Sequence, residues 1–409
     1  MPFQPQLKKL NFDLNQFLKA ISFSLDFVEI DILGSTANHS RRVAYISNRI
    51  SKKMKLNSAT QTDITAFSLL HDNGLSEEAL HTDLDIEKLN KLQRMEGLKE
   101  HCSFGQRNVF DYPFNNTKDQ IIKYHHENFD GTGFFHLKGN EIPISAQIIS
   151  LADFVDNFIK FNIKNRRKIN DFINQNENKR FSKDLVTVFT ELSNQTKFWL
   201  DLEDQFVIQA LDEISLPLNL ELTWKEIFEI TKVFTNIVDS KSKFTARHTS
   251  GLIQKAQKAA EFYNYNIEEK YKLVIAASLH DLGKLAISKN ILEKNGRLTV
   301  TEMNKMKSHV YYTKVALKQM KIFNAIKEWA ANHHEKLNGK GYPEGLDRTQ
   351  LDFNSRLMSC LDIFQALTEK RPYRRPSPYN EVKKIMLNMS KKDFIDSEIT
   401  TQVLEFLSF

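Results

Sequence analysis

The stretch SLHDLGK, residues 278–284, has a close counterpart in LLHDNGL, residues 69–75. Each places a histidine directly before an aspartate, and the two histidines, His71 and His280, are 209 residues apart. One such pair carries little weight, because a single histidine on a helix is more often a core or surface residue than a ligand. The prediction of the fold therefore depends on whether other residues of the chain also repeat at this interval.

Most other histidines, and two aspartates, do repeat at an interval of 208 or 209 residues. The second-half set is His248, His280, Asp281, His309, His333, His334 and Asp362. The first-half set is His39, His71, Asp72, His101, His125, His126 and Asp153. Scattered histidines would not show matched spacings twice. The sequence thus predicts an internal duplication, with one domain over residues 1–200 and a second over 201–409.

Proline usage indicates the fold class. None of the nine prolines falls within residues 144–216 or 218–342, and proline breaks helix interiors. The stretch SGLIQKAQKAAEFYN, residues 250–264, has apolar residues at the helical spacing. We expect an all-α protein made of two tandem helical domains.

Composition narrows the classes of protein. With 41% hydrophobic and 26% charged residues, the chain resembles a soluble globular protein. It has no apolar run long enough to cross a bilayer and no secretory start. The two cysteines, Cys102 and Cys360, are interpreted as free thiols in the cytoplasm. A net charge of +6 favours a mildly basic surface over binding of a nucleic-acid polymer, and leaves open a basic pocket for a small anion.

The repeated residues form a nitrogen and oxygen ligand set that suits Fe, Mn, Ni or Zn. Seven ligands exceed the need of one tetrahedral ion and suit two ions that share a carboxylate, for which Asp281 is the candidate. Neighbours on a helix point about 100° apart, so His333 and His334 would reach different ions or opposite sides of one cluster. Paired ions activate water for attack on phosphorus. A metal site that only stabilises the fold is the alternative interpretation.

The second half has features that the first lacks. Lys284 follows Asp281 by three residues, where the first half has Leu75, and a cation there would steady phosphate charge. NGKGYP follows the paired histidines in the second half, and DGTGFF follows them in the first. The glycines of NGKGYP would let the backbone approach a ligand, and Tyr342 would stack on a base or hydrogen-bond to it. A basic run at 370–375 suits either a phosphate-binding rim or solvated surface.

The motifs LHDLGK, MKSHV, HHEKLNGKGYPEGL and LDIFQALTEKRPYR, with the upstream FTARHT, resemble those of the HD-GYP family of HD phosphohydrolases. The resemblance implies an all-helical phosphodiesterase, with two divalent transition-metal ions, that linearises a bacterial cyclic dinucleotide. It implies that the seven second-half residues bind metal and that Asp281 and Lys284 act in catalysis. It assigns substrate contacts to Gly341, Tyr342, Pro343, Arg371 and Arg374. The first half is similar to a more divergent HD domain.

Some features depart from the family pattern or leave alternatives open. Phe244 stands where some members have a glutamate that helps to hold a third metal, so a two-metal site is expected. The sequence does not choose between cyclic di-GMP and 3′,3′-cyclic GMP-AMP. The other hypotheses are a cyclic-dinucleotide sensor or scaffold without catalysis, for which the first half is the better candidate, and an HD-type nucleotide phosphohydrolase. A homodimer is also expected.

Overall fold

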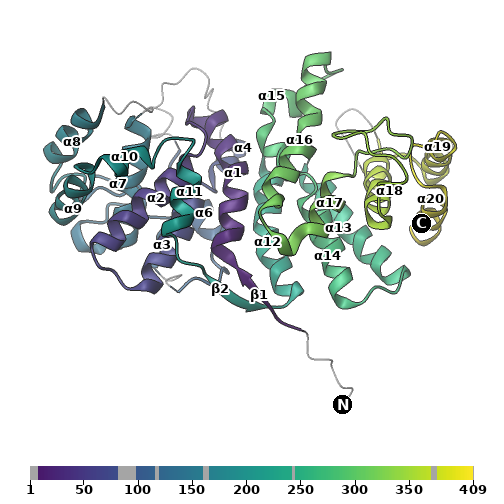
Figure 1. The fold of residues 1–409 in the computed structure, drawn as a ribbon. Helices are drawn as coiled ribbons and strands as arrows, with labels where there is room; N and C mark the ends of the chain where they lie inside the picture. Colours follow the sequence, from purple (N-terminus) through teal and green to yellow (C-terminus); the bar gives the residue numbers. More distant parts are fainter. Residues whose placement is uncertain are drawn as a thin grey trace. The chain divides into compact units, whose positions relative to one another are not determined.

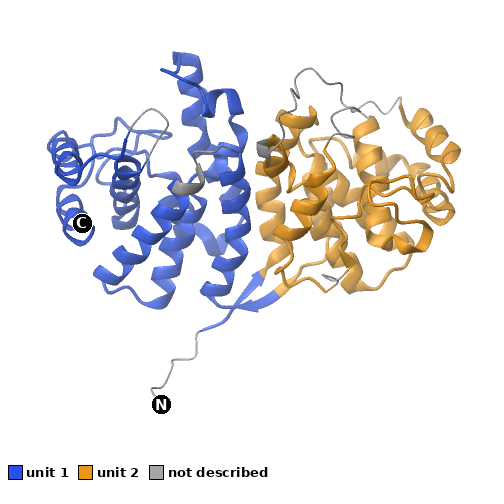
Figure 2. Ribbon diagram, turned by 180° about the vertical axis from the view of Figure 1, so that it is seen from behind, with its two compact units in different colours: residues 1–12, 220–409 blue, residues 13–219 orange. Residues whose placement is uncertain are grey.

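The computed structural model describes residues 8–81, 98–115, 119–159, 165–241, 245–369 and 375–408. The chain divides into two compact units, which are coloured separately in Figure 2. Residues 13–219 form the N-terminal unit, and residues 1–12 with 220–409 form the C-terminal unit. The two units are described one at a time.

The N-terminal unit is built from helices joined by turns (Figure 1). They are α1 (Leu14–Leu33), α2 (His39–Lys53), α3 (Ser58–Leu70), α4 (Leu75–His81), α6 (Glu100–Asn108), the 3₁₀ helix η3 (Gly139–Glu141), α7 (Ile144–Ile159), α8 (Arg166–Gln175), α9 (Lys183–Ser193), α10 (Thr196–Leu200) and α11 (Val207–Ile214). Helix α2 packs against α3, α7 and α11, so it lies at the centre of the unit.

The C-terminal unit is also helical (Figure 1). Its helices are α12 (Trp224–Ser240), α13 (Thr245–Phe262), α14 (Ile267–Leu279), η5 (Leu282–Ala286), α15 (Lys289–Leu292), α16 (Val300–Lys318), η6 (Lys321–Phe323), α17 (Asn324–Ala331), α18 (Phe353–Thr368), α19 (Tyr379–Lys391) and α20 (Ser397–Phe406). Helix α13 packs against α12, α14 and α18. The packing of α13 with α14 and α18 matches that of α2 with α3 and α7.

Local sequence accounts for where the main helices begin. Thr223, Asn266 and Thr299 each cap a helix with their side chains, and a glutamate three residues later completes the capping box. The all-α fold class is confirmed. The described residues add one two-stranded sheet, in which β1 (Leu10–Asp13) pairs with β2 (Asn219–Leu222).

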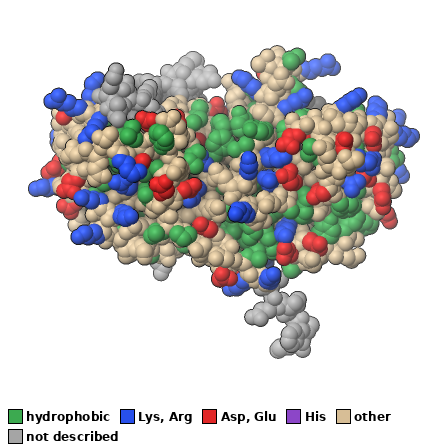
Figure 3. Space-filling view, in the orientation of Figure 1, with side chains coloured by type: hydrophobic (Ala, Val, Ile, Leu, Met, Phe, Trp, Pro, Cys, Tyr) green, Lys and Arg blue, Asp and Glu red, His purple; other side chains and the backbone are tan. Residues whose placement is uncertain are grey.

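Three further expectations, on membrane-spanning helices, cysteines and surface charge, can be compared with the structure. In the part of the chain that is described, no helix has both the length and the apolar character needed to cross a bilayer. Both cysteines are free, and both are buried. On the face shown in Figure 3, Lys and Arg side chains are interspersed with Asp and Glu side chains, so that face carries no large patch of a single sign.

Candidate metal centres

Five segments of the C-terminal unit bring one set of side chains together. These are His248 on α13, His280 and Asp281 directly after α14, His309 on α16, His333 and His334 after α17, and Asp362 on α18. Ligand atoms of His309, His333 and His334 lie within 4.8 Å of one another, and so do those of His248, His280 and Asp281. The sequence-predicted set is therefore contiguous in space and falls into two groups.

Main-chain hydrogen bonds orient the histidines. Nδ1 of His280, His309 and His333 lies 2.7–2.8 Å from the carbonyl oxygen three residues earlier, of Ala277, Met306 and Ala330. Because a carbonyl only accepts, Nδ1 carries the proton and the Nε2 lone pair faces the cluster. Such outer partners of a histidine fix its tautomer for metal binding.

The two groups are linked by the carboxylate of Asp281. Its Oδ2 lies 3.0 Å from Nε2 of His280, while its Oδ1 lies 3.4 Å from Nε2 of His309. Each oxygen of one carboxylate thus faces a different group of ligands. This is the geometry that a carboxylate bridging two ions requires.

His248 is held between two acids. Its Nε2 lies 2.9 Å from Oδ1 of Asp362, and its Nδ1 lies 3.1 Å from Oε2 of Glu369. Burial opposes a charge on His248, but Asp362 and Glu369 outweigh it and raise its pKa to about 9. Glu369 was not among the residues singled out from the sequence, although it lies within the stretch LDIFQALTEKRPYR, seven residues after Asp362.

Three of the other imidazoles, those of His309, His333 and His334, stay neutral. Burial lowers the pKa of His309 to about 3, against the attraction of Asp281. Burial also lowers the pKa of His333 and of His334. In contrast, the pKa of Asp281 falls well below its usual value, because His280 and Lys284 outweigh its own burial. Neutral imidazoles beside ionised carboxylates are the protonation states that bind divalent metals.

Lys284 lies beside the bridging acid. Asp281 caps the 3₁₀ helix η5, in which residues three apart eclipse one another, and Nζ of Lys284 lies 2.5 Å from Asp281 Oδ2. Gly283 lets this turn approach α16, since a Cβ there would meet the carbonyl oxygen of His309 at 1.9 Å.

The loop after the paired histidines is fixed by a carboxylate. Glu335 accepts backbone N–H groups from Glu344, Gly345 and Leu346 at 2.7–3.2 Å. A Cβ on Gly341 would meet the Cα of Glu335 at 2.4 Å, so this glycine is required by the loop's own backbone.

The aromatic ring of this loop borders the histidines. The ring of Tyr342 lies 4.9 Å from that of His334, and Nζ of Lys307 lies 5.2 Å from the Tyr342 centroid. Pro343 follows Tyr342 through a cis peptide bond. The Gly-Tyr-Pro segment therefore adjoins the cluster through Tyr342.

Two sequence expectations need comment. The prediction that His333 and His334 lie on a helix was wrong, because α17 ends at Ala331 and the pair occupies the following turn. Arg371, Arg374 and Phe244 lie outside the described residues.

The N-terminal unit repeats the arrangement. Nδ1 of His71, His101 and His125 faces the carbonyl oxygens of Ser68, Leu98 and Ile122, again three residues earlier. Asp72 divides its oxygens in the same way, with Oδ2 3.5 Å from His71 Nε2 and Oδ1 3.3 Å from His101 Nε2. His126 lies beside His125, with ring centroids 4.0 Å apart, and Asp153 Oδ1 lies 3.3 Å from His39 Nε2.

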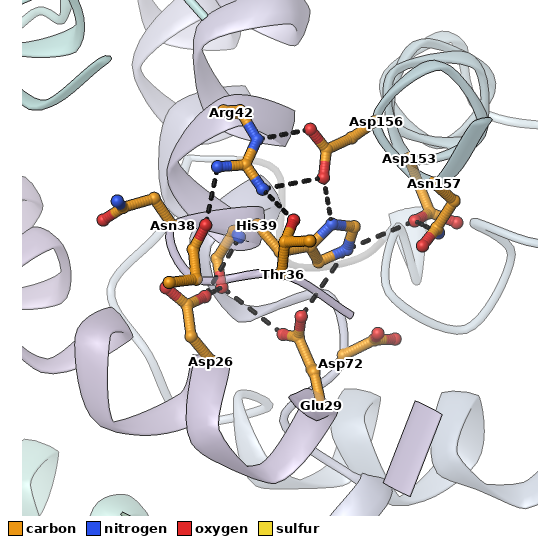
Figure 4. Close-up of polar contacts among 12 residues, drawn as sticks. Asp26, Glu29, Thr36, Asn38, His39, Arg42, Asp72, Asp153, Asp156 and Asn157 are labelled. Atoms are coloured by element: carbon orange, nitrogen blue, oxygen red, sulfur yellow. Dashed lines mark hydrogen bonds and ion pairs between the residues drawn. The ribbon is translucent and has the colours of Figure 1, made fainter. Parts of the chain in front are cut away.

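Additional carboxylates surround His39 (Figure 4). Its Nδ1 lies 2.6 Å from Oδ2 of Asp156, whose Oδ1 accepts from Arg42 Nε at 2.5 Å. Its Nε2 lies 3.5 Å from Oε2 of Glu29 on α1. Glu29, Arg42 and Asp156 were not singled out from the sequence. Glu29 and Asp156 contact His39 directly, Asp156 from 117 positions away, and Arg42 acts on His39 through Asp156.

Cys102 is a further residue that the sequence analysis did not place at a site. Its Sγ lies 3.5 Å from Nε2 of His101. Burial opposes ionisation of this thiol, but His101 and His125 outweigh burial and lower its pKa to about 7. The sequence held two signals for it, the neighbouring His101 and the Val310 that stands 208 residues later.

Both clusters fit divalent metal ions. Nε2 of His39, His71, His125, His280 and His309 is buried and makes no hydrogen bond to any residue that the structure describes. Buried polar atoms without partners are costly, and a bound cation would satisfy these lone pairs. The donors are imidazoles and carboxylates, with one thiol in the N-terminal unit.

Comparison with known proteins agrees with this geometry. The family model described as "HD domain" matches residues 28–171 and again 232–399. The chain is 28% identical over 402 residues to 3′3′-cGAMP-specific phosphodiesterase 1 of Vibrio cholerae, covering 95% of this chain and 90% of that protein. It is 37% identical over 142 residues to a probable cyclic di-GMP phosphodiesterase of V. cholerae, covering 33% of this chain and 32% of that protein.

A solved structure shares the fold. The crystal structure of the V. cholerae cyclic GMP-AMP-specific phosphodiesterase V-cGAP3 matches with a TM-score of 0.70 at 22% identity, over 98% of this chain and 99% of that one. Because the family model covers most of the sequence, the chain belongs to the HD domain family.

Proposed function

We propose that this protein is a metal-dependent phosphodiesterase that hydrolyses 3′,3′-cyclic GMP-AMP to a linear 5′-phosphorylated dinucleotide. The observation that carries the proposal is the division of the Asp281 carboxylate between His280 and His309, with Lys284 at the same carboxylate. This arrangement combines a bridging ligand for two ions with a cation placed to meet phosphate.

The residues have distinct roles in the proposal. His248, His280 and Asp362 would hold one ion, and His309, His333 and His334 the other, with Asp281 shared. Fe, Mn or Ni suits this donor set. Two such ions, when bound, activate water and offset charge in an in-line displacement at phosphorus. Lys284 would steady the phosphate oxygens, and Tyr342 would hold a base at the edge of the cluster.

The choice of substrate rests on the extent of the similarity. The relative that matches along 95% of this chain is named as specific for 3′3′-cGAMP. The relative named as a probable cyclic di-GMP phosphodiesterase matches over 33% of it. Similarity that extends along the whole chain, and so through both units, therefore favours 3′,3′-cyclic GMP-AMP over cyclic di-GMP.

We assign hydrolysis to residues 201–409 and a regulatory role to residues 1–200. In the N-terminal unit Leu75 takes the place of Lys284, and it is buried. Phe134 packs against His126 with ring centroids 5.6 Å apart, where the C-terminal unit has Tyr342 against His334. This unit keeps a metal-type cluster without the substrate-side cation, which supports binding or regulation in place of cutting.

The test compares two matched double variants of the full chain. Mn- or Fe-loaded protein is incubated separately with 3′,3′-cyclic GMP-AMP and cyclic di-GMP, and the linear products are separated by chromatography. The variant His280→Ala/Asp281→Ala is expected to abolish both reactions, and His71→Ala/Asp72→Ala is expected to retain hydrolysis. Hydrolysis that survives the first variant overturns the proposal, and faster cleavage of cyclic di-GMP overturns the substrate choice.

A further inference from the structure

The N-terminal cluster contains a sulfur ligand that its C-terminal counterpart lacks. The ligand atoms of His101, Cys102, His125 and His126 all lie within 4.8 Å of one another. The residue 208 positions after Cys102 is Val310, which cannot bind a metal. The two clusters thus share their three imidazoles here but differ in the fourth group.

The spacing of these atoms matches one kind of metal site. Cys102 Sγ lies 3.5 Å from His101 Nε2. A tetrahedral zinc ion, with Zn–S of about 2.3 Å and Zn–N of about 2.0–2.1 Å, holds its sulfur and nitrogen ligands about 3.5 Å apart. The observed contact therefore equals one edge of such a tetrahedron.

A second observation points into the same centre. Nε2 of His125 is fully buried and makes no hydrogen bond to any described residue, and the same holds for Oδ1 of Asp72. These two atoms lie 3.6 Å apart. Nδ1 of His125 is already bonded to the carbonyl oxygen of Ile122 at 2.6 Å, so its lone pair on Nε2 can only be satisfied from within the cluster.

Little free space adjoins the centre. The cavity next to it has a volume of about 10 Å³ and is lined in part by Leu75, Leu98 and His126. A volume of this size admits about one water molecule, and a dinucleotide cannot enter it. Metal sites with four protein ligands and no open position stabilise structure, whereas catalytic sites keep a position free.

We propose that the N-terminal unit binds Zn²⁺ through the Cys102 thiolate and the imidazoles of His101, His125 and His126, with Oδ1 of Asp72 beside these ligands. The thiolate shifts metal preference, because soft sulfur ligands select zinc whereas the nitrogen and oxygen set of the C-terminal unit also accepts Fe or Mn. One chain thus holds two classes of metal centre. The inference does not depend on the proposed phosphodiesterase activity.

The test uses the fact that the chain has only two cysteines. In Cys360→Ser protein, Cys102 is the sole thiol. Metal-free Cys360→Ser protein is loaded with Co²⁺, and its near-ultraviolet absorption is recorded. A thiolate-to-cobalt charge-transfer band is expected, and it should disappear when Zn²⁺ displaces the cobalt.

A second variant is used to measure the number of zinc ions bound per chain. Cys102→Val introduces the residue that the C-terminal unit has at the matching position, and it is expected to bind one fewer zinc per chain by elemental mass spectrometry. Absence of the cobalt–thiolate band in folded Cys360→Ser protein overturns the proposal. Unchanged zinc content in Cys102→Val also overturns the proposal, because Cys102 of the parent protein would then bond to His101 without binding zinc. The band is measured without altering Cys102, so poor folding of Cys102→Val leaves the test intact.

Discussion

Nζ of Lys284 lies 2.5 Å from Oδ2 of Asp281, the oxygen that also lies 3.0 Å from His280 Nε2. Because the lysine side chain is partly exposed, with 22% of its surface accessible, it reaches both the buried acid and solvent. A substrate phosphate that approaches the cluster would therefore meet this ammonium group.

We expect Lys284→Met to lower kcat by about 10²- to 10³-fold, the usual loss when one group that stabilises transition-state charge is removed. Metal content should stay at the parent level, because lysine does not bind the ions. Lys305→Met, which changes an exposed lysine on α16, is the matched control and should leave kcat unaltered. Loss of metal together with activity would contradict this role for Lys284.

Glu335→Ala is expected to raise KM for the dinucleotide and to destabilise the C-terminal unit by about 1.5–3 kcal/mol, the range for hydrogen bonds to a charged group. Its carboxylate accepts three backbone N–H groups of the loop that carries Tyr342. Urea unfolding and steady-state kinetics measure the two effects.

The control for Glu335 is its counterpart in the other unit. Glu127 accepts the N–H groups of Phe135 at 2.6 Å and Leu137 at 2.7 Å. Glu127→Ala should therefore be destabilising while leaving KM near the parent value. Equal changes of KM in both variants would argue against a role for the Glu335 loop in substrate binding.

Gly341→Ala should destabilise the protein by about 1–3 kcal/mol, the cost of overpacking. Its Cβ would lie 2.4 Å from the Cα of Glu335 and 2.4 Å from the backbone N of Lys336, and backbone cannot yield as a side chain can. The melting temperature measures the loss of stability. The rate of dinucleotide hydrolysis tests whether the loop has been displaced. Lys340→Ala, an exposed change one residue earlier, should alter neither, and an unchanged melting temperature in Gly341→Ala would refute the steric argument.

Asp156→Ala is expected to destabilise the N-terminal unit by about 3–5 kcal/mol, because it leaves a buried arginine without its main partner. The Arg42 side chain is fully buried, and its Nε donates to Asp156 at 2.5 Å (Figure 4). The positions 209 residues later carry Gly251 and Gln365. The double change Arg42→Gly/Asp156→Gln should therefore be milder than Asp156→Ala in urea unfolding; a larger loss would contradict this account of the pair.

Much of the fold and the cluster could be predicted from the spacing of residues. His71 and His280 follow helices that end at Leu70 and Leu279, and matched intervals place the other ligands on matching segments. Helical periodicity and the absence of proline are local properties, so they indicate the all-α class directly. The proposed duplication and the domain boundary at residue 200 stay predictions.

Contacts between distant segments could not be predicted. Glu29 on α1 and Glu369 after α18 approach their histidines through helix packing, and neither was singled out from the sequence. The paired histidines lie past the end of α17, because that helix ends at Ala331, three residues before His334. Aligning the two halves would have marked Cys102 against Val310 as a difference in ligand type.

The sequence by itself determined which residue types recur and at what interval, and hence the ligand sets and the helical class, because these depend on covalent order and short-range periodicity. Only the tertiary structure decided that Asp281 and Asp72 each divide their oxygens between two groups of histidines. It also decided that Cys102 Sγ turns toward His101. The division of each carboxylate depends on where separate helices cross, because its two groups of histidines come from segments far apart in the chain. The direction of the Cys102 side chain follows from how α6 packs.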